Sequence, residues 1–530
     1  MQAGRGETAI RGGAGASGRA PELRSGSLPA AWLAAAWLAA AWLAAAWLLA
    51  RGLRARSPFA RRALTLALLA VAAAPAGAQE APTSAAATAS PAATTLPPLP
   101  AAPPGWTLKG VVLLSRHGMR APTHSVHCTG APENCLNAVA EQPWPTLGVS
   151  AGHLTISGAE RTRRLAGFYR AHYAAEGLFP AQDCPDPDRV AYLTDGVERT
   201  IVTAGAMMDG MFPGCFLHPL KVKPGLYHGP RCGYAPAAAL AASQALAGGS
   251  FATLENGALA GAIAQLDTVL GPFRPEGCAA NGASAPCSLA TLPRRADAPG
   301  ALRLASPLAE QFLMQYGMGL PENEVAWGRL PAATGLPLGA AVTAVNVLHA
   351  ESERLMNMPR YQAEKLGSPV AAPVLAALER LADGHGPAFT FFSSHDTLIL
   401  NAAGLLGLSW HLPGFHPYQV PPGGGIAFEL WQPPAGELML RPVYYAQTLD
   451  QLRSDAELSD AAPPSSTLVA VAGCAGGADG FCSWPAFRAM AEGAIDRQCV
   501  GARPHGAGRA AKKGRKPEAA GISGENGASE

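Results

Sequence analysis

The sequence predicts an α/β fold, because three apolar runs have the character of buried strands and two of them lead into helical patterns. The runs cover residues 111–114, 190–194 and 388–392. Short aliphatic and aromatic runs between polar residues are typical of strands buried on both faces. The helical pattern after the second run extends to about Met211, and the pattern after the third, 398–406, ends at Gly407. Strands that alternate with helices predict a sheet with helices packed on it.

Each of the three runs is followed by a cation or a titratable group. These groups are Arg116, His117 and Arg120 after the first run, Arg199 after the second, and His395 and Asp396 after the third. Arg199 also lies in the first turn of a helix, where unpaired backbone N–H groups favour an anion. Open α/β sheets bind ligands at the carboxyl ends of their strands. We therefore expect these side chains to form one anion site at a single edge of the sheet.

These residue types suit the hydrolysis of a phosphate monoester, whose negative charge repels nucleophiles. Arginine side chains donate in pairs to phosphate oxygens. Their charges lower the pKa of His117, so that its imidazole stays neutral in acid and can attack phosphorus. We expect Asp396 to protonate the leaving alkoxide and then to activate the water that releases phosphate. His395 is expected to donate a further hydrogen bond to the phosphate oxygens.

Each of these residues also has a simpler structural interpretation. His117 alone could be a core histidine between solvated arginines. Asp396 could cap the helix that follows it. Arg199 could pair with Asp195 or Glu198 on the surface, although such a pair contributes only about 0–1 kcal/mol.

At these motifs the chain resembles the histidine acid phosphatase family, and most closely its bacterial periplasmic branch of phytases and glucose-1-phosphatases. The resemblance covers about Trp106 to Cys499 and rests on segments 116–122, 152–155, 198–200, 395–397, 421–425 and 428–431. It implies a three-layer α/β sandwich, phosphoglycerate-mutase-like, with an inserted all-helical subdomain. It also implies a phosphohistidine on His117, with Asp396 as the acid.

The same resemblance implies two further substrate contacts. Thr123 is implied to bind substrate, and Glu310 to lie near the leaving group, whereas the ordinary interpretation of Glu310 is a solvated helix residue. The sequence departs from the family pattern at Leu398, where asparagine is usual, and the bracing of the loop behind Asp396 is therefore open. It also departs at His124, where phytases have lysine, and the lost charge favours a general phosphatase over a dedicated phytase.

Composition divides the 530 residues into several parts. Residues 1–78 are expected to be an N-terminal extension with a signal peptide, since Arg61 and Arg62 precede an apolar segment that ends in Ala-Gly-Ala. The upstream Ala-Trp-Leu-Ala-Ala repeat is apolar enough for a transmembrane helix, but its short regular period suggests a translated DNA repeat. Residues 79–105 and 501–530 are too poor in large apolar groups to fold, and we expect a disordered linker and a disordered basic tail.

The remaining residues are expected to form two units. A discontinuous α/β catalytic domain comprises 106–226 and 384–500, and a helical subdomain comprises 227–383. Within the subdomain, alanine- and leucine-rich patterns predict helices over 235–246, 253–269 and 308–318.

All ten cysteines lie between Cys128 and Cys499, and an even number in an exported chain predicts disulfides. The resemblance implies four of the pairs and leaves a fifth: Cys184–Cys215, Cys278–Cys287, Cys474–Cys482, Cys232–Cys499, and then Cys128–Cys135.

A formal net charge of +2 gives no reason to expect nucleic acid or an anionic membrane as a partner. We expect no stable membrane anchor, no cofactor and no metal, because the histidine spacing does not fit a zinc site. The sequence thus predicts a periplasmic acid phosphatase for small phosphomonoesters such as glucose 1-phosphate or phytate. The alternatives are a dedicated phytase and a phosphate-ligand binding protein without turnover.

Overall fold

The computed structural model describes residues 99–123, 135–217, 220–229, 232–454, 456–474 and 479–500. The expected N-terminal extension with its signal peptide, most of the linker, and the basic tail lie outside these residues. The boundaries of the expected domains therefore remain a prediction.

A mixed sheet runs through the described part of the chain, with eight strands in the order β10-β7-β6-β1-β4-β2-β3 and β8 paired with β7. Strands β1, β4, β2 and β3 are parallel, and β6, β7, β8 and β10 extend the sheet in antiparallel pairs. Their bounds are Thr107–Arg116 (β1), Val190–Thr194 (β2), Lys221–Val222 (β3), Phe389–Ser394 (β4), Gly425–Gln432 (β6), Met439–Ala446 (β7), Ser465–Leu468 (β8) and Cys482–Ser483 (β10). A second, two-stranded sheet joins Leu408–Ser409 (β5) to Ala470–Val471 (β9).

Strand β1 is buried on both faces, as its apolar run predicts. Val111 and Leu113 pack into one hydrophobic core, and Val112 and Leu114 pack into another. Register pairs Arg116 with Ser394 of β4, and β4 in turn pairs with β2. The three predicted strands therefore end at the same edge of the sheet, which is the arrangement that gathers the residues following them.

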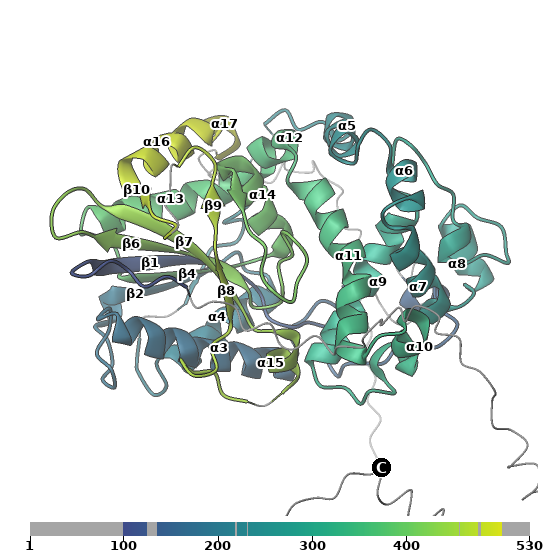
Figure 1. Cartoon of the computed structure of the whole chain (residues 1–530), viewed down its shortest axis with the longest axis horizontal. Coiled ribbons are helices and arrows are strands. Elements are labelled where there is room, and N and C mark those ends of the chain that lie inside the picture. The colour runs from purple at the N-terminus through teal and green to yellow at the C-terminus, as the bar shows by residue number, and fades with distance from the viewer. Residues whose placement is uncertain are drawn as a thin grey trace, which may run out of the picture. The chain divides into compact units, whose positions relative to one another are not determined.

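Helices cover both faces of this sheet, and Figure 1 shows the three layers. One face carries Ile156–Ala175 (α3) and Glu198–Met211 (α4); the other carries Ser368–Ala382 (α13), Asp396–Leu406 (α14), Trp484–Ala494 (α16) and Arg497–Val500 (α17). The predicted three-layer α/β sandwich is confirmed. Gly407 ends α14 in the left-handed conformation, as the sequence predicts.

Further helices lie beside the sheet (Figure 1). They are Pro236–Leu246 (α5), Phe251–Asn256 (α6), Ala260–Leu270 (α7), Pro275–Ala280 (α8), Ala301–Gly317 (α9), Leu330–Thr334 (α10), Leu338–Asn357 (α11), Arg360–Gln362 (α12) and Leu449–Arg453 (α15). The helix predicted over 253–269 is wrong as a single element, because the chain leaves helical geometry at Gly257 (φ −107°, ψ −104°) and forms α6 and α7 instead. Helix α9 begins at Ala301, earlier than predicted, and accommodates Pro307 in its second turn.

The stretch Pro236–Asn256 is long and apolar enough, by length and composition alone, to cross a membrane. Gly248 and Gly249, both with positive φ, separate α5 from α6 within it. Such a stretch is weak evidence for a membrane span, and the expected absence of an anchor remains a prediction.

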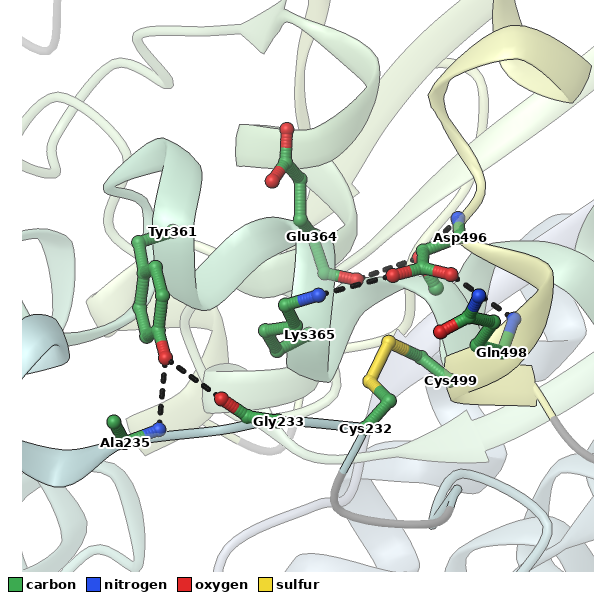
Figure 2. Close-up of a disulfide and its surroundings, with 10 residues drawn as sticks. Cys232, Gly233, Ala235, Tyr361, Glu364, Lys365, Asp496, Gln498 and Cys499 are labelled. Carbon is green, nitrogen blue, oxygen red and sulfur yellow. Dashed lines mark hydrogen bonds and ion pairs between the residues drawn. A yellow bond between two sulfur atoms is a disulfide. The ribbon is translucent and has the colours of Figure 1, made fainter.

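Four of the implied disulfides are present: Cys184–Cys215, Cys278–Cys287, Cys474–Cys482 and Cys232–Cys499. Cys128, expected to pair with Cys135, lies outside the described residues. The Cys232–Cys499 bridge spans 267 residues and ties α17 to the start of the helical region (Figure 2). Beside it, Asp496 holds Lys365 at 3.0 Å, which fixes the C-terminal end of the described chain against α13 and its preceding turn.

Candidate active site

His117 lies at the carboxyl edge of the sheet, in the tight turn that follows β1. Its backbone N–H donates to the carbonyl of Ser394 (2.9 Å), and its carbonyl accepts from the N–H of Gly423 (3.0 Å). The next residue must be small, since a Cβ at Gly118 would lie 2.8 Å from Thr162 Oγ1 and 2.9 Å from the carbonyl of Gly158. The turn is thus clamped between two other segments, and it holds His117 with only 2% of its surface exposed.

The surroundings of the His117 ring define which nitrogen is reactive. Nδ1 lies 2.8 Å from the carbonyl oxygen of Gly118. A carbonyl only accepts hydrogen bonds, so Nδ1 carries the proton of the neutral ring and Nε2 keeps its lone pair. Burial, with the charges of Arg116 and Arg120, holds the pKa of His117 well below its usual value. The imidazole is therefore neutral in acid, with Nε2 available as a nucleophile.

Arg116 and Arg120 share one buried carboxylate, that of Glu310 on α9. Arg116 Nη2 pairs with Glu310 Oε1, Arg120 Nη2 lies 2.8 Å from Oε2, and Arg116 Nη1 donates to the carbonyl of Val420 (2.6 Å). Burial raises the pKa of Glu310, but the two arginine charges outweigh it and lower that pKa to about 2. Glu310 is 3% exposed, so its interpretation as a solvated helix residue is wrong.

Three arginines at this edge each retain an unused donor. Among the described residues, the buried Nε–H groups of Arg116, Arg120 and Arg199 have no hydrogen-bond partner. Buried N–H groups without an acceptor are rare in folded proteins, and each one calls for an explanation. Guanidinium donors that converge on one edge, beside a neutral histidine, fit the binding of an oxyanion.

Arg199 contacts His395 rather than a surface carboxylate. Its Nη2 donates to His395 Nδ1 (3.2 Å), and His395 Nε2 donates to Asp195 Oδ2 (2.9 Å). Glu198 instead accepts the N–H of Leu154 (2.9 Å), so the surface pairing considered for Arg199 is wrong. Both ring nitrogens of His395 are engaged in this way, and Nδ1 can donate to a phosphate only when Arg199 turns away from it and the ring is protonated.

Asp195 is a site residue that the sequence analysis missed. Its carboxylate is buried and accepts hydrogen bonds from Thr200 Oγ1 (2.7 Å) and the N–H of Val197 (3.2 Å) as well as from His395. Burial raises the pKa of Asp195, but these hydrogen bonds outweigh it and lower the pKa to about 2. Asp195 follows β2 directly, as His117 follows β1, and that position is the signal that could have identified it.

Asp396 is the first residue of α14; His395 occupies the N-cap position, and its side chain makes no capping hydrogen bond. The Asp396 Oδ1 atom accepts the N–H of Thr397 (2.8 Å), and Asp396 Oδ2 lies 2.7 Å from Arg116 Nη2. Burial raises the pKa of Asp396, but Arg116 and a neighbouring histidine outweigh it, so the pKa lies well below its usual value. Leu398 lies within α14, where Asn401 Nδ2 donates to the carbonyl of Thr397 one turn earlier in the same helix (2.8 Å).

Two titratable residues of α11, both missed in the sequence analysis, complete the cluster. His349 Nε2 lies 3.5 Å from Glu310 Oε1 and 3.8 Å from Asp396 Oδ2, while its Nδ1 lies 3.1 Å from Ser306 Oγ. Glu353 is one helical turn further along α11, on the same face. The signal was a histidine and a glutamate four residues apart within one helix.

The remaining predicted residues lie at the rim or beyond the described chain. Gly152 separates Thr123 from Arg199: a Cβ there would lie 3.8 Å from Thr123 Cγ2 and 3.7 Å from Arg199 Nη1. Thr123 is thus close to the arginine. His124, which bears on substrate preference, lies outside the described residues.

Two groups among the described residues are close enough to hold a metal ion. In the first, Glu310, His349 and Asp396 each offer an atom within 4.8 Å of the others, but Arg116 already pairs with both carboxylates. The second contains Cys232 and Cys499, whose sulfurs are joined in a disulfide. The positive charge that neutralises the carboxylates of Glu310 and Asp396 is therefore the guanidinium of Arg116.

Comparison with known proteins gives relatives with a shared chemistry. The family model of the histidine phosphatase superfamily (branch 2) matches residues 107–244. The chain is 30% identical to phytase AppA of Escherichia coli over 422 residues, which cover 72% of this chain and 91% of that protein. It is 25% identical to a glucose-1-phosphatase of Providencia rettgeri, covering 74% and 92%. Among solved structures, the Hafnia alvei phytase is 30% identical, with a TM-score of 0.65 over 75% of this chain and 99% of that one.

Proposed function

This chain belongs to branch 2 of the histidine phosphatase superfamily, and on that premise we propose that it is an acid phosphatase for small organic phosphomonoesters. The observation that supports this most directly is His117 itself. It is a buried neutral imidazole with its proton on Nδ1, surrounded by arginines whose Nε–H groups find no partner among the residues that the structure describes. Histidine chemistry on an oxyanion accounts for both features at once.

Arginine charges perform the binding step in this proposal. The phosphate dianion takes up the free donors of Arg116, Arg120 and Arg199, and Thr123, which like Arg199 lies beside Gly152, contributes a further contact. Phosphoryl transfer depends mainly on positioning and charge neutralisation, which this set of donors supplies. Glu310 holds two of the arginines in place, and Asp195 holds His395.

The chemical step is attack by His117 Nε2 on phosphorus, which forms a phosphohistidine and expels the alkoxide. Asp396, at the first turn of α14, is placed to protonate that alkoxide and then to take a proton from the attacking water. His395 adds a hydrogen bond to the phosphate once Arg199 has moved onto the substrate and both ring nitrogens of His395 carry a proton. Phosphate leaves, and His117 returns to its neutral state.

The substrate class follows from the relatives, which are named phytase and glucose-1-phosphatase. One neighbouring structure, the Hafnia alvei phytase, holds myo-inositol hexakis sulphate. We propose that this chain accepts both sugar phosphates and phytate, with the histidine at position 124 weakening its preference for highly charged substrates. A dedicated phytase is the alternative, and kcat/KM for phytate against glucose 1-phosphate separates the two.

Export to the periplasm is part of the same proposal. Four disulfides join residues across the described chain, and stable disulfides require an oxidising compartment. The signal-like segment that ends near residue 78 supports this. Mass spectrometry of the mature N-terminus tests it, with cleavage after Ala78 as the expected result.

Acid-quench labelling with a phosphate ester carrying radioactive phosphorus tests the mechanism. The wild type is expected to retain label on a histidine, and His117→Ala is expected to retain none. His172→Gln, which replaces a histidine of α3, is the matched control and is expected to label normally. An unlabelled wild type that still binds phosphate would identify a binding protein without turnover, and equal labelling of His117→Ala would place the nucleophile elsewhere.

A further inference from the structure

The general acid of the proposed mechanism has no proton to give in the resting site. Asp396 Oδ2 lies 2.7 Å from Arg116 Nη2, and this charge keeps the carboxyl ionised even in acid. An ionised carboxylate cannot protonate an alkoxide. A proton must therefore reach Asp396 from a neighbour after substrate binds.

The neighbour with a proton available is His349 on α11. Its Nε2 lies 3.8 Å from Asp396 Oδ2 and 3.5 Å from Glu310 Oε1. Burial lowers the pKa of His349, but the charge of Glu310 and its contact with Asp396 outweigh burial and raise it. His349 therefore holds a second proton in acid, and its Nε2 lies near both carboxylates, 3.5 Å from Glu310 and 3.8 Å from Asp396, which needs the proton.

Glu353 reinforces this arrangement from one turn along the same helix. Its Oε2 accepts a hydrogen bond from Asn357 Nδ2 (2.9 Å), which holds the carboxyl in place. Burial and the negative charges of Asp396 and Glu310 raise the pKa of Glu353 to about 7. The groups facing His349 are thus Glu310 from α9, Glu353 from α11, Asp396 from α14 and Arg116 from β1. The ionised carboxylates of Glu310 and Asp396 favour its protonated form in acid, and Glu353 adds to their effect as it ionises near pH 7.

We propose that His349 is a positioning residue that supplies Asp396 with the proton for the leaving group, with Glu310 keeping His349 charged. This inference rests on the proposed phosphatase function. Binding of a phosphate dianion draws Arg116 toward the substrate and places negative charge beside Asp396, so a proton moves from His349 Nε2 to Asp396 Oδ2.

The protons balance over the cycle. As the bond from His117 Nε2 to phosphorus forms and the ester P–O bond breaks, the alkoxide takes the proton of Asp396 and leaves as an alcohol. In the second half, water gives a proton to Asp396 while its oxygen bonds phosphorus and the P–N bond breaks. That proton returns to His349, so the products are alcohol and inorganic phosphate, and the site is restored.

The test compares substrates whose leaving groups need a proton with one that does not. In His349→Gln, kcat/KM for glycerol phosphate is expected to fall about 100-fold, whereas kcat/KM for 4-nitrophenyl phosphate falls less than about threefold. The retained activity on the nitrophenyl ester shows that the variant folds and still forms phosphohistidine. His416→Gln is the matched control, because His416 bonds the carbonyl of Thr343 on the same helix but lies outside the cluster. An equal loss on both substrates, or no loss on either, would overturn the proposal.

A second variant covers the case in which His349→Gln does not fold. In Glu353→Gln the pKa of His349 falls, so the basic limb of kcat/KM for glycerol phosphate is expected to move to lower pH. Glu351→Gln on the same helix, whose wild-type carboxylate pairs with Arg354 (2.7 Å), is expected to leave that limb in place. An unmoved limb in Glu353→Gln would count against the proposal. Loss of histidine labelling in the wild type would instead refute the proposed phosphatase itself.

Discussion

Two buried arginine–glutamate groups in the described part of the chain differ in how completely their polar atoms are satisfied by hydrogen bonds. The first is the site group, in which Arg116 and Arg120 share Glu310. The second is the sheet pair, in which Arg441 of β7 lies opposite Glu429 of β6 in the strand register. All five side chains have less than a tenth of their surface exposed.

Every polar atom of the sheet pair has a partner. Arg441 Nε and Nη2 donate to Glu429 Oε2 (2.9 and 2.8 Å), and its Nη1 donates to the carbonyl of Pro100 (2.9 Å). Trp431 Nε1 donates to the same carboxylate oxygen (3.1 Å), and two tyrosine hydroxyls donate to Oε1 at 3.4 Å. In the site group, by contrast, the Nε–H groups of both arginines have no partner among the described residues.

The difference in hydrogen-bond satisfaction distinguishes a structural ion pair from a binding site made of the same residue types. A buried pair with every donor used has nothing left for a ligand and contributes to the fold. A buried cluster with unused donors bears a desolvation cost that only a ligand relieves. Between these two groups, satisfaction of the hydrogen bonds, rather than residue type or burial, separates the pair that stabilises the fold from the cluster that we propose binds a ligand.

The largest expected effect is a loss of catalytic activity on removal of Arg199, the arginine beside the site group. Arg199→Met is expected to lower kcat/KM by about 10³-fold, because the residue neutralises transferring phosphate. Its unfolding free energy should change by less than about 1 kcal/mol, since Arg199 donates to the carbonyl of Gly152 and to a ring nitrogen of His395, and its loss strands no carboxylate. Steady-state kinetics with 4-nitrophenyl phosphate and urea unfolding measure the two quantities. A variant that is unstable but fully active would reverse our assignment.

The opposite result is expected for the sheet pair. Arg441→Met leaves Glu429 buried without its cation, and we expect a loss of about 3 kcal/mol in unfolding free energy with unchanged kcat per folded molecule. Thermal and urea unfolding, with activity normalised to folded protein, provide the measurement. The double variant Glu429→Leu/Arg441→Met should recover part of the loss, because a buried pair can be replaced by apolar side chains. Loss of turnover in either variant would show that the pair also serves the site.

The sequence predicted correctly the strands and the residues that directly follow them. It did not predict which residues far apart in the chain form buried ion pairs. Apolar runs predicted β1, β2 and β4, and their shared edge placed His117 beside His395. Burial of Glu310 between two arginines 190 or more residues away depends on how α9 packs against the sheet, which helical periodicity cannot specify. His349 was missed for a related reason: the spacing of His349 and Glu353 places both on one face of a helix, but it does not specify that this face meets the strand edge.

A smaller effect concerns the pH dependence of kcat/KM, which tests whether the positive charges of the site arginines lower the pKa of His117. Removing one of them, in Arg120→Gln, makes protonation of His117 easier, so the pKa of His117 rises toward its usual value. The acidic limb of kcat/KM should move upward by about one pH unit, which is about tenfold in activity on that limb. Arg163→Gln, an exposed arginine of α3, is the control and should not move it. An unchanged limb would mean that burial alone keeps His117 neutral.

The smallest effect links the site group to stability. Glu353 has a pKa raised from 4.5 to about 7, so the folded state favours its protonated form more strongly than the unfolded chain does. Its contribution to stability is complete below pH 4.5 and is lost as pH rises through about 7. Glu353→Gln removes this dependence, and we expect its Tm to exceed that of the wild type by a few °C at pH 8 but not at pH 4, corresponding to about 1 kcal/mol. The sheet pair should behave differently. For Glu429→Gln no gain in Tm is expected at pH 8, because Arg441 would lose its counter-charge. Equal Tm shifts in Glu353→Gln and Glu429→Gln would contradict the distinction between a titrating carboxyl in the active-site cluster and a structural ion pair between two strands.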